Sequence, residues 1–122
     1  MAKRILVIED NEDIALVVAT TLKLRNYEVL TATDGVQGMK MAFSTAFDLI
    51  ILDILLPELD GYQVLQKLKS NPQTENVPIA LFSAHVNEQE RRHALQAGAA
   101  AVLLKPFEPR QFIQEIGALL NE

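Results

Sequence analysis

Short apolar runs alternate along this chain with longer segments in which apolar residues recur at helical spacing. Four runs are almost wholly apolar, which is typical of strands buried on both faces of a parallel sheet. These runs cover residues 5–8, 48–52, 79–82 and 102–104. A fifth run, residues 28–32, is more polar and is predicted to be a strand at the sheet edge.

Capping and turn residues between the runs predict five helices. The predicted helices lie near 12–25, near 35–45, near 61–70, from Asn87 to Gly98, and from Pro109 onward. Asp60 and Asn87 have the side chains preferred at N-caps. Gly98 is placed as a C′ residue, and Pro109 falls in the first turn of the last helix.

Each of three predicted helices has one apolar face that we expect to pack on the sheet. For the first helix the predicted inward residues are Ile14, Val17, Val18 and Thr21. For the third they are Val64, Leu65 and Leu68. For the last they are Phe112, Ile113, Ile116 and Leu120.

The alternation of strand and helix predicts a single α/β domain over residues 1–122. We expect a three-layer, doubly wound (flavodoxin-like) parallel sheet of five strands. The strand order 2-1-3-4-5 follows because the second strand is polar enough for an edge and the third is apolar enough for the centre.

Composition excludes several classes of protein. The chain has 122 residues, 49% of them hydrophobic and 22% charged, which indicates a globular domain. It has no cysteine, and it shows no signal-peptide pattern and no apolar run long enough for a bilayer. A cytoplasmic location is expected. The net charge is −5 and the basic residues form no patch beyond isolated pairs, so direct binding to nucleic acid or membrane is not expected.

Polar residues of different chemical kinds follow the four apolar runs. Glu9 and Asp10 follow the first, and Asp53, Ser83 and Lys105 follow the others in chain order. Parallel strands place their carboxyl ends on one edge of the sheet, which is where open α/β sheets bind ligands. The sequence therefore predicts that three acids, a hydroxyl and an amine meet there.

The acids suit a divalent cation. Two like charges about 4 Å apart repel by roughly 4 kcal/mol at an effective dielectric of about 20, so such a cluster calls for a cation or a raised carboxyl pKa. Oxygen ligands with open access suit Mg²⁺. For Glu9 and Asp10 taken alone, a simpler interpretation is open: they belong to the acidic start of the first helix, where the helix dipole favours them.

Asp53 ends the most apolar strand and is expected to be partly desolvated. A carboxylate is a competent nucleophile toward phosphorus. Lys105 either reaches solvent or pairs with Asp53 and later binds a phosphate oxygen, and the Ser83 hydroxyl is placed to donate to another. Cation ligands, nucleophile, hydroxyl and amine together are what phosphoryl transfer requires.

Four motifs give the chain a resemblance to a known family. Ile-Leu-Val-Ile-Glu-Asp-Asn (5–11), Leu-Asp-Ile-Leu-Leu-Pro-Glu-Leu-Asp-Gly (52–61), Phe-Ser-Ala (82–84) and Gly-Ala-Ala-Ala-Val-Leu-Leu-Lys-Pro-Phe (98–107) stand in the order and spacing of receiver domains of two-component response regulators, the chemotaxis-regulator type included. The resemblance covers essentially the whole chain. It implies a phosphorelay signalling domain that modifies only itself and is not an enzyme acting on metabolites.

The resemblance also implies roles for individual residues. Asp53 resembles the phosphoacceptor, Ser83 the switch hydroxyl and Lys105 the phosphate-binding lysine. Glu9, Asp10, Asp53 and the main-chain carbonyl of Leu55 resemble the ligands of Mg²⁺ or Mn²⁺. The implied donor is a sensor histidine kinase or a histidine phosphotransfer protein, and the implied recipient is a downstream output. The family further implies a cis peptide between Lys105 and Pro106.

Four residues depart from the family pattern. Val102 stands where many members have Tyr or Phe, and valine cannot make the large inward rotation of that ring. Ala100 and Ala101 replace an acidic pair of the winged-helix branch, so the salt-bridged dimer of that branch is not expected. Glu9 replaces the commoner Asp, which keeps the charge and adds reach.

The same residues bear on three other possible functions. A flavodoxin-like cofactor carrier would need a hydroxyl- or glycine-rich loop where Glu9 to Asp13 would repel a phosphate. An aspartyl phosphatase would need an acid at residue 55, which is leucine. A degenerate receiver that only docks proteins is the remaining alternative. The loop after Asp53 contains three leucines, Leu55, Leu56 and Leu59. Either one or two of them fold back into the core, or they form an apolar rim that docks a partner. His85 is interpreted as an exposed histidine.

Overall fold

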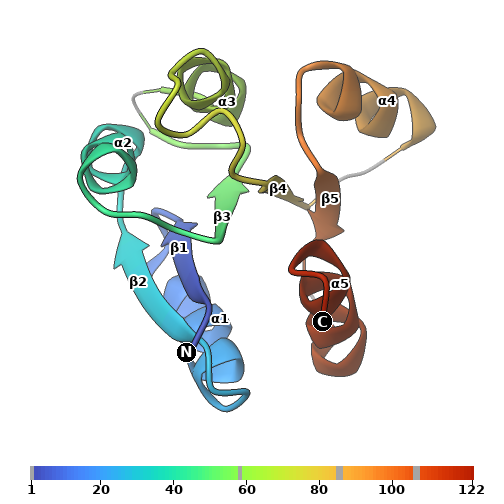
Figure 1. Cartoon of the computed structure of the whole chain (residues 1–122). Coiled ribbons are helices and arrows are strands. Elements are labelled where there is room, and N and C mark those ends of the chain that lie inside the picture. Colours follow the sequence, from blue (N-terminus) through green and yellow to red (C-terminus); the bar gives the residue numbers. More distant parts are fainter. Residues whose placement is uncertain (1, 58, 85–86, 106–107) are drawn as a thin grey trace.

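The computed structural model describes residues 2–57, 59–84, 87–105 and 108–122, and it shows a five-stranded parallel sheet in the order β2-β1-β3-β4-β5 (Figure 1). The strands are β1 (Arg4–Ile8), β2 (Glu28–Ala32), β3 (Leu49–Asp53), β4 (Ile79–Ser83) and β5 (Ala101–Leu104). The helices are α1 (Glu12–Lys23), α2 (Gly35–Ser44), α3 (Gly61–Lys69), α4 (Glu88–Gln96) and α5 (Pro109–Leu119). The predicted fold class and strand order are confirmed.

The sheet separates two apolar clusters because successive side chains of a strand point to opposite faces. Leu6 and Ile8 of β1 pack with residues of α2, α3 and α4. Ile5 and Val7 pack with residues of α1 and α5. Figure 1 shows the same division, with α1 and α5 together on one face of the sheet and the other helices opposite. The domain therefore has the predicted three layers.

The predicted edge and centre of the sheet are also confirmed. All five residues of β3 are buried, whereas only two of the five in β2 are. The outer position of β2 in the strand order leaves its far side without a neighbouring strand among the described residues. Asp53 is the last residue of this buried central strand and is itself buried.

Side-chain caps set the helix starts. The side chains of Asn11, Asp34, Asp60 and Asn87 each accept a backbone N–H three residues on, and Asp60 forms a reciprocal capping box with Gln63. Gly98 follows α4 with φ of 108°, as a C′ glycine should. The predicted caps at Asp60, Asn87 and Gly98 are confirmed.

The predicted inward face of α1 is partly wrong. Its buried residues are Ala15, Val18, Ala19 and Leu22. Val17 is 53% exposed, and Ile14 is only partly buried. The prediction chose the larger apolar residues for the inward face. In the structure, the two alanines face the sheet, and their small side chains let the helix lie close to it. The buried faces of α3 and α5 agree with prediction, except that Ile113 is only partly buried.

The loop after Asp53 is held at the start of α3. The Gly61 amide donates to the Ile54 carbonyl at 2.7 Å. A Cβ at residue 61 would lie 2.6 Å from both the Asp53 carbonyl oxygen and the Ile54 Cα. Of the nearby leucines, Leu56 is buried and Leu55 is 76% exposed, so part of the loop does fold into the core.

We predict that Gly61→Ala destabilises the domain by about 1–3 kcal/mol, because backbone atoms must move to admit the methyl group. Gly117→Ala is the matched control, since a Cβ there meets nothing within 4 Å and α5 gains helix propensity. It should stabilise by about 0.5–1 kcal/mol. Urea unfolding of both variants measures the difference, and equal midpoints would contradict the close approach at residue 61.

Candidate phosphoryl-transfer site

The sheet register brings the four strand ends together. Ile8 pairs with Leu52, Asp53 with Phe82, and Ser83 with Leu104. Because Glu9 and Lys105 directly follow β1 and β5, they emerge on the same edge as Asp53 and Ser83. Together they border a pocket of about 290 Å³. Its lining residues are Glu9, Asp10, Asn11, Ile14, Asp53, Ile54, Leu55, Ser83, Ala84 and Lys105.

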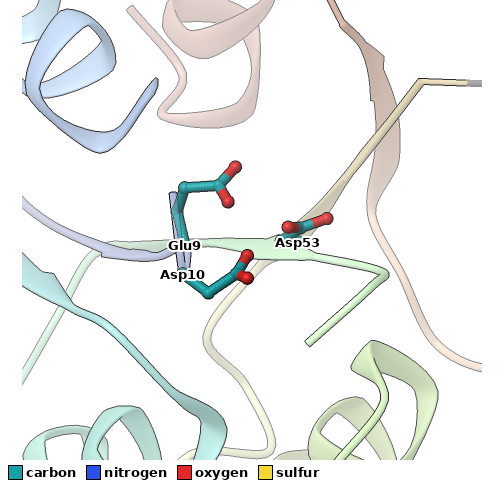
Figure 2. A group of neighbouring side chains, drawn as sticks. All are labelled: Glu9, Asp10 and Asp53. Carbon is teal, nitrogen blue, oxygen red and sulfur yellow. The ribbon is translucent and has the colours of Figure 1, made fainter. Parts of the chain in front are cut away.

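Three carboxylates converge in this pocket. Glu9, Asp10 and Asp53 each offer an oxygen, and these oxygens lie within 4.8 Å of one another. Glu9 is 1% exposed and Asp53 is 5% exposed, whereas Asp10 is open to solvent. Figure 2 shows the first two side by side at the end of β1, facing Asp53 across the pocket. The predicted gathering of the acids is confirmed, as is the burial of Asp53.

Lys105 offsets the charge of the two buried acids. Its Nζ lies 2.6 Å from Glu9 Oε1 and 3.3 Å from Asp53 Oδ2. The same nitrogen lies 5.0 Å from the centre of the Phe82 ring, within the range of a cation–π contact. Burial lowers the pKa of this ammonium, but the hydrogen bond that it donates to Glu9 and the charges of both acids outweigh that effect and raise the pKa overall. Lys105 is therefore a fixed cation at neutral pH and does not simply reach solvent.

Backbone amides hold the remaining oxygens of the buried acids. The Asn11 amide donates to Glu9 Oε2 at 3.1 Å, and the Leu55 amide donates to Asp53 Oδ1 at 3.1 Å. The side chain of Asn11, not of Glu9, caps α1, whose first-turn acids are Glu12 and Asp13. The helix-start interpretation is thus wrong for Glu9, because its carboxylate is buried against Lys105.

The pocket fits a small divalent cation. The acid cluster offers only oxygen atoms, and the exposed Asp10 keeps one side open to water. Mg²⁺ favours this combination of few carboxylates with retained waters. A cation there would share Glu9 and Asp53 with Lys105, so the ammonium and the cation compete for the same carboxylates.

Ser83 and Leu55 also line the pocket, as predicted. The Ser83 carbonyl accepts the Lys105 amide at 2.7 Å, which ties the two strand ends together. His85, Pro106 and the expected cis peptide lie outside the described residues. The sequence analysis did not predict the contact between Phe82 and the Lys105 ammonium. The one feature that could have indicated it is the position of Phe82 next to Ser83, at the end of an apolar strand.

Fold and pocket together define a class: a doubly wound α/β domain with a carboxylate cation site at the carboxyl edge of its sheet and a buried aspartate at the end of its central strand. Within that class, the family model for the response regulator receiver domain matches residues 5–117. The chain belongs to this family. Receiver domains are signalling modules and not enzymes that act on metabolites.

Curated relatives include the alkaline phosphatase synthesis transcriptional regulatory protein PhoP of Bacillus subtilis, 37% identical over 121 residues, which are 99% of this chain and 50% of that protein. Another is the DNA-binding dual master transcriptional regulator RpaA of Synechocystis, 34% identical over 97% of this chain and 49% of that protein. The chain spans about half the length of both.

Solved structures of similar proteins have the same fold. The chemotaxis response regulator CheY4 of Vibrio cholerae has a TM-score of 0.94 at 27% identity, over 98% of this chain and 100% of that chain. The receiver domain of the sensor histidine kinase PA1611 of Pseudomonas aeruginosa has a TM-score of 0.90 at 29% identity, over 100% of both chains. The latter was solved with a magnesium ion in its active-site cleft.

Within the described residues, none of the helices has the length and apolar character that crossing a bilayer requires.

We predict that Mg²⁺ raises the melting temperature, because a ligand held only by the folded state stabilises it by about 2.7 kcal/mol at 100 times its Kd. Asp10→Asn should remove most of this shift, since it takes away the most accessible acid. Asp13→Asn loses the same charge in the first turn of α1 and should retain the shift. Thermal unfolding over a Mg²⁺ series checks this, and equal loss in both variants would contradict a localised cation site.

Lys105→Met should lower stability without Mg²⁺ and enlarge the stabilisation by Mg²⁺. The change leaves Glu9 and Asp53 buried without their cation, at a cost of about 3–5 kcal/mol, and removes the competitor for their oxygens. Isothermal titration with Mg²⁺ should give a lower Kd for the variant. A higher Kd would show that Lys105 does not compete with the cation.

Proposed function

We propose that Asp53 is the phosphoacceptor of this receiver domain. One observation carries the assignment: the Asp53 carboxylate is nearly buried, yet borders the cation pocket and is held by the Leu55 amide on one oxygen and Lys105 on the other. These contacts aim the carboxylate into the pocket. A positioned and partly desolvated carboxylate is suited to attack on phosphorus.

The proposed ligands of Mg²⁺ or Mn²⁺ are the carboxylates of Glu9, Asp10 and Asp53 and the carbonyl of Leu55. The acid cluster supports the first three. Leu55 is supported by its place in the same pocket, where its amide donates a hydrogen bond to the Asp53 carboxylate. When bound, the cation supplies charge neutralisation between the acids and the incoming phosphoryl group.

In the proposed transfer, an Asp53 oxygen attacks the phosphorus of a phosphohistidine as its N–P bond breaks. Lys105 leaves Asp53 Oδ2 and binds a phosphate oxygen as a point charge. The Ser83 hydroxyl donates to another phosphate oxygen. The backbone hydrogen bond from the Lys105 amide to the Ser83 carbonyl keeps the two residues next to each other during this change.

The proposed output is a shift in the population of two conformations. Val102 is largely buried and belongs to the same apolar cluster as Ala94, the one buried residue of α4. The rings of Tyr62 in α3 and His93 in α4 lie 4.7 Å apart. A helix with one buried residue responds to backbone movement near Ser83 without an aromatic side chain at residue 102.

The proposed donor is a sensor histidine kinase or a histidine phosphotransfer protein. An open groove of about 630 Å³ beside the pocket supports this partner. It runs between α1 and α5, its lining is mostly apolar, and it includes Ile14, Val17, Ala84 and Pro109. A donor helix packed there would bring its phosphohistidine to Asp53.

We also propose that residues 1–122 form one receiver domain acting on a separate or attached output, in the cytoplasm with its donor.

We predict that wild type incubated with acetyl phosphate and Mg²⁺ gains one labile phosphoryl group and that Asp53→Asn gains none. The substitution keeps the shape of the side chain and removes its nucleophilic oxygen. Intact mass spectrometry reads the adduct. Asp13→Asn is the control and should be labelled as wild type is. A label unchanged in the Asp53 variant would refute the assignment.

The alternative, a degenerate receiver that only docks proteins, predicts no phosphoryl adduct on wild type at any Mg²⁺ concentration. Backbone NMR separates it further. The proposed function requires Mg²⁺-dependent shifts on phosphorylation in α4 and β5, whereas the docking module would show none.

We predict that Val17→Glu slows transfer from a phosphohistidine donor by at least about tenfold and leaves acetyl phosphate labelling unchanged. A charge in the groove opposes packing of a donor helix, while the pocket stays intact. Leu24→Glu is the control, because Leu24 is 78% exposed at the far end of α1. Equal slowing in both variants would place the donor elsewhere.

A further inference from the structure

Lys69, at the end of α3, differs from Lys105 in that its partners among the described residues are neutral carbonyls. Its Nζ donates to the carbonyls of Glu75 at 3.0 Å and Val77 at 2.8 Å. In the described part of the chain, no carboxylate forms an ion pair with it. Its stem lies beside Gly98, where an added Cβ would be 3.3 Å from Lys69 Cγ. The amine is therefore held in one place by neutral partners.

This arrangement satisfies a neutral amine as well as an ammonium. A neutral amine has two N–H donors, and there are two carbonyls to accept them, which leaves its lone pair unused. Burial lowers the pKa of Lys69. Lys69 is only partly buried, and the hydrogen bond of its Nζ to the Glu75 carbonyl is exposed, so a small reagent can reach the nitrogen.

We propose that Lys69 is a site of acylation by small acyl phosphates. The lone pair of Nζ attacks the carbonyl carbon, a C–N bond forms, and the C–O bond to phosphate breaks. Inorganic phosphate leaves with the electron pair of that bond, and the surplus proton of the amine passes to solvent. The products are an amide on Lys69 and free phosphate.

Two other lysines give internal comparisons. Lys67 lies in the same turn of α3 and is exposed, so it reports the reactivity of an ordinary lysine. Lys105 is also partly buried, but ion pairs with Glu9 and Asp53 occupy its N–H donors. The order of reactivity expected in the folded protein is Lys69, then Lys67, then Lys105.

The test is incubation of wild type with acetyl phosphate near neutral pH without Mg²⁺, followed by peptide mapping of acetyl groups at low total modification. Lys69 should be acetylated several-fold faster than Lys67. In urea-unfolded protein the two rates should become equal, because the preference depends on the fold. A rate at Lys69 equal to or below that at Lys67 in the folded protein, or a preference that persists in urea, overturns the proposal.

Lys69→Arg provides a second measurement. Arginine keeps the charge and the donors but does not acylate under these conditions, so the label at residue 69 should vanish while that at Lys67 stays. Acetylated Lys69 has a single N–H and can serve only one of its two carbonyls. The treated wild type should therefore melt at a lower temperature, and treated Lys69→Arg should not. An equal decrease in both would overturn the assignment to Lys69. The acetyl adduct differs in mass and stability from a phosphoryl adduct, so this result is independent of Asp53.

Discussion

The structure depends on one ion-paired group: the Lys105 ammonium set between the buried carboxylates of Glu9 and Asp53. Without it, two nearly buried acids would lie close together at the end of an apolar sheet with no positive charge between them. The ammonium offsets their charge and lets the sheet bury both side chains. The domain can thus hold Asp53 at the edge of the pocket without a bound cation.

The sheet topology makes this grouping possible. Residues 9, 53, 83 and 105 are distant in sequence, yet parallel pairing of β1, β3, β4 and β5 puts them on one edge. Short loops then fix their directions. Gly61 lets the chain turn closely beneath Asp53, and the amide of Leu55 orients its carboxylate. Ile14, Ala84 and Lys105 line both the pocket and the apolar groove, so the two lie side by side.

Much of this was predictable from the sequence. Apolar runs that end in polar residues predicted the strands, the site edge and the strand order. The burial of Asp53 followed from its place after a fully apolar strand. These features are local or follow from the topology, so the spacing of apolar residues is enough to predict them. For Ser83 and Lys105, the position after a strand left more than one interpretation open, and the expected roles in switching and phosphate binding came from the motif resemblance.

The rest depends on distances that sequence does not encode. The inward face of α1 was misjudged at Val17 because side-chain size was taken as a guide, whereas Ala15 and Ala19 set how close the helix lies. Glu9 was assigned both to a cation and to a helix start, and only the structure shows its carboxylate on Lys105. The two carbonyls around Lys69 come from the loop between α3 and β4, and no pattern marks them.

The position of Lys105 above Phe82 has one more consequence. Phe82 and Lys105 both line the groove between α1 and α5, and the Phe82 ring lies 6.3 Å from that of Phe112 in α5. In the proposed transfer, the Lys105 ammonium moves toward the phosphoryl group on Asp53. That movement would take its positive charge away from the Phe82 ring and so change the chemistry of the proposed donor groove. A donor that has given up its phosphoryl group would then face a different surface from the one it first bound.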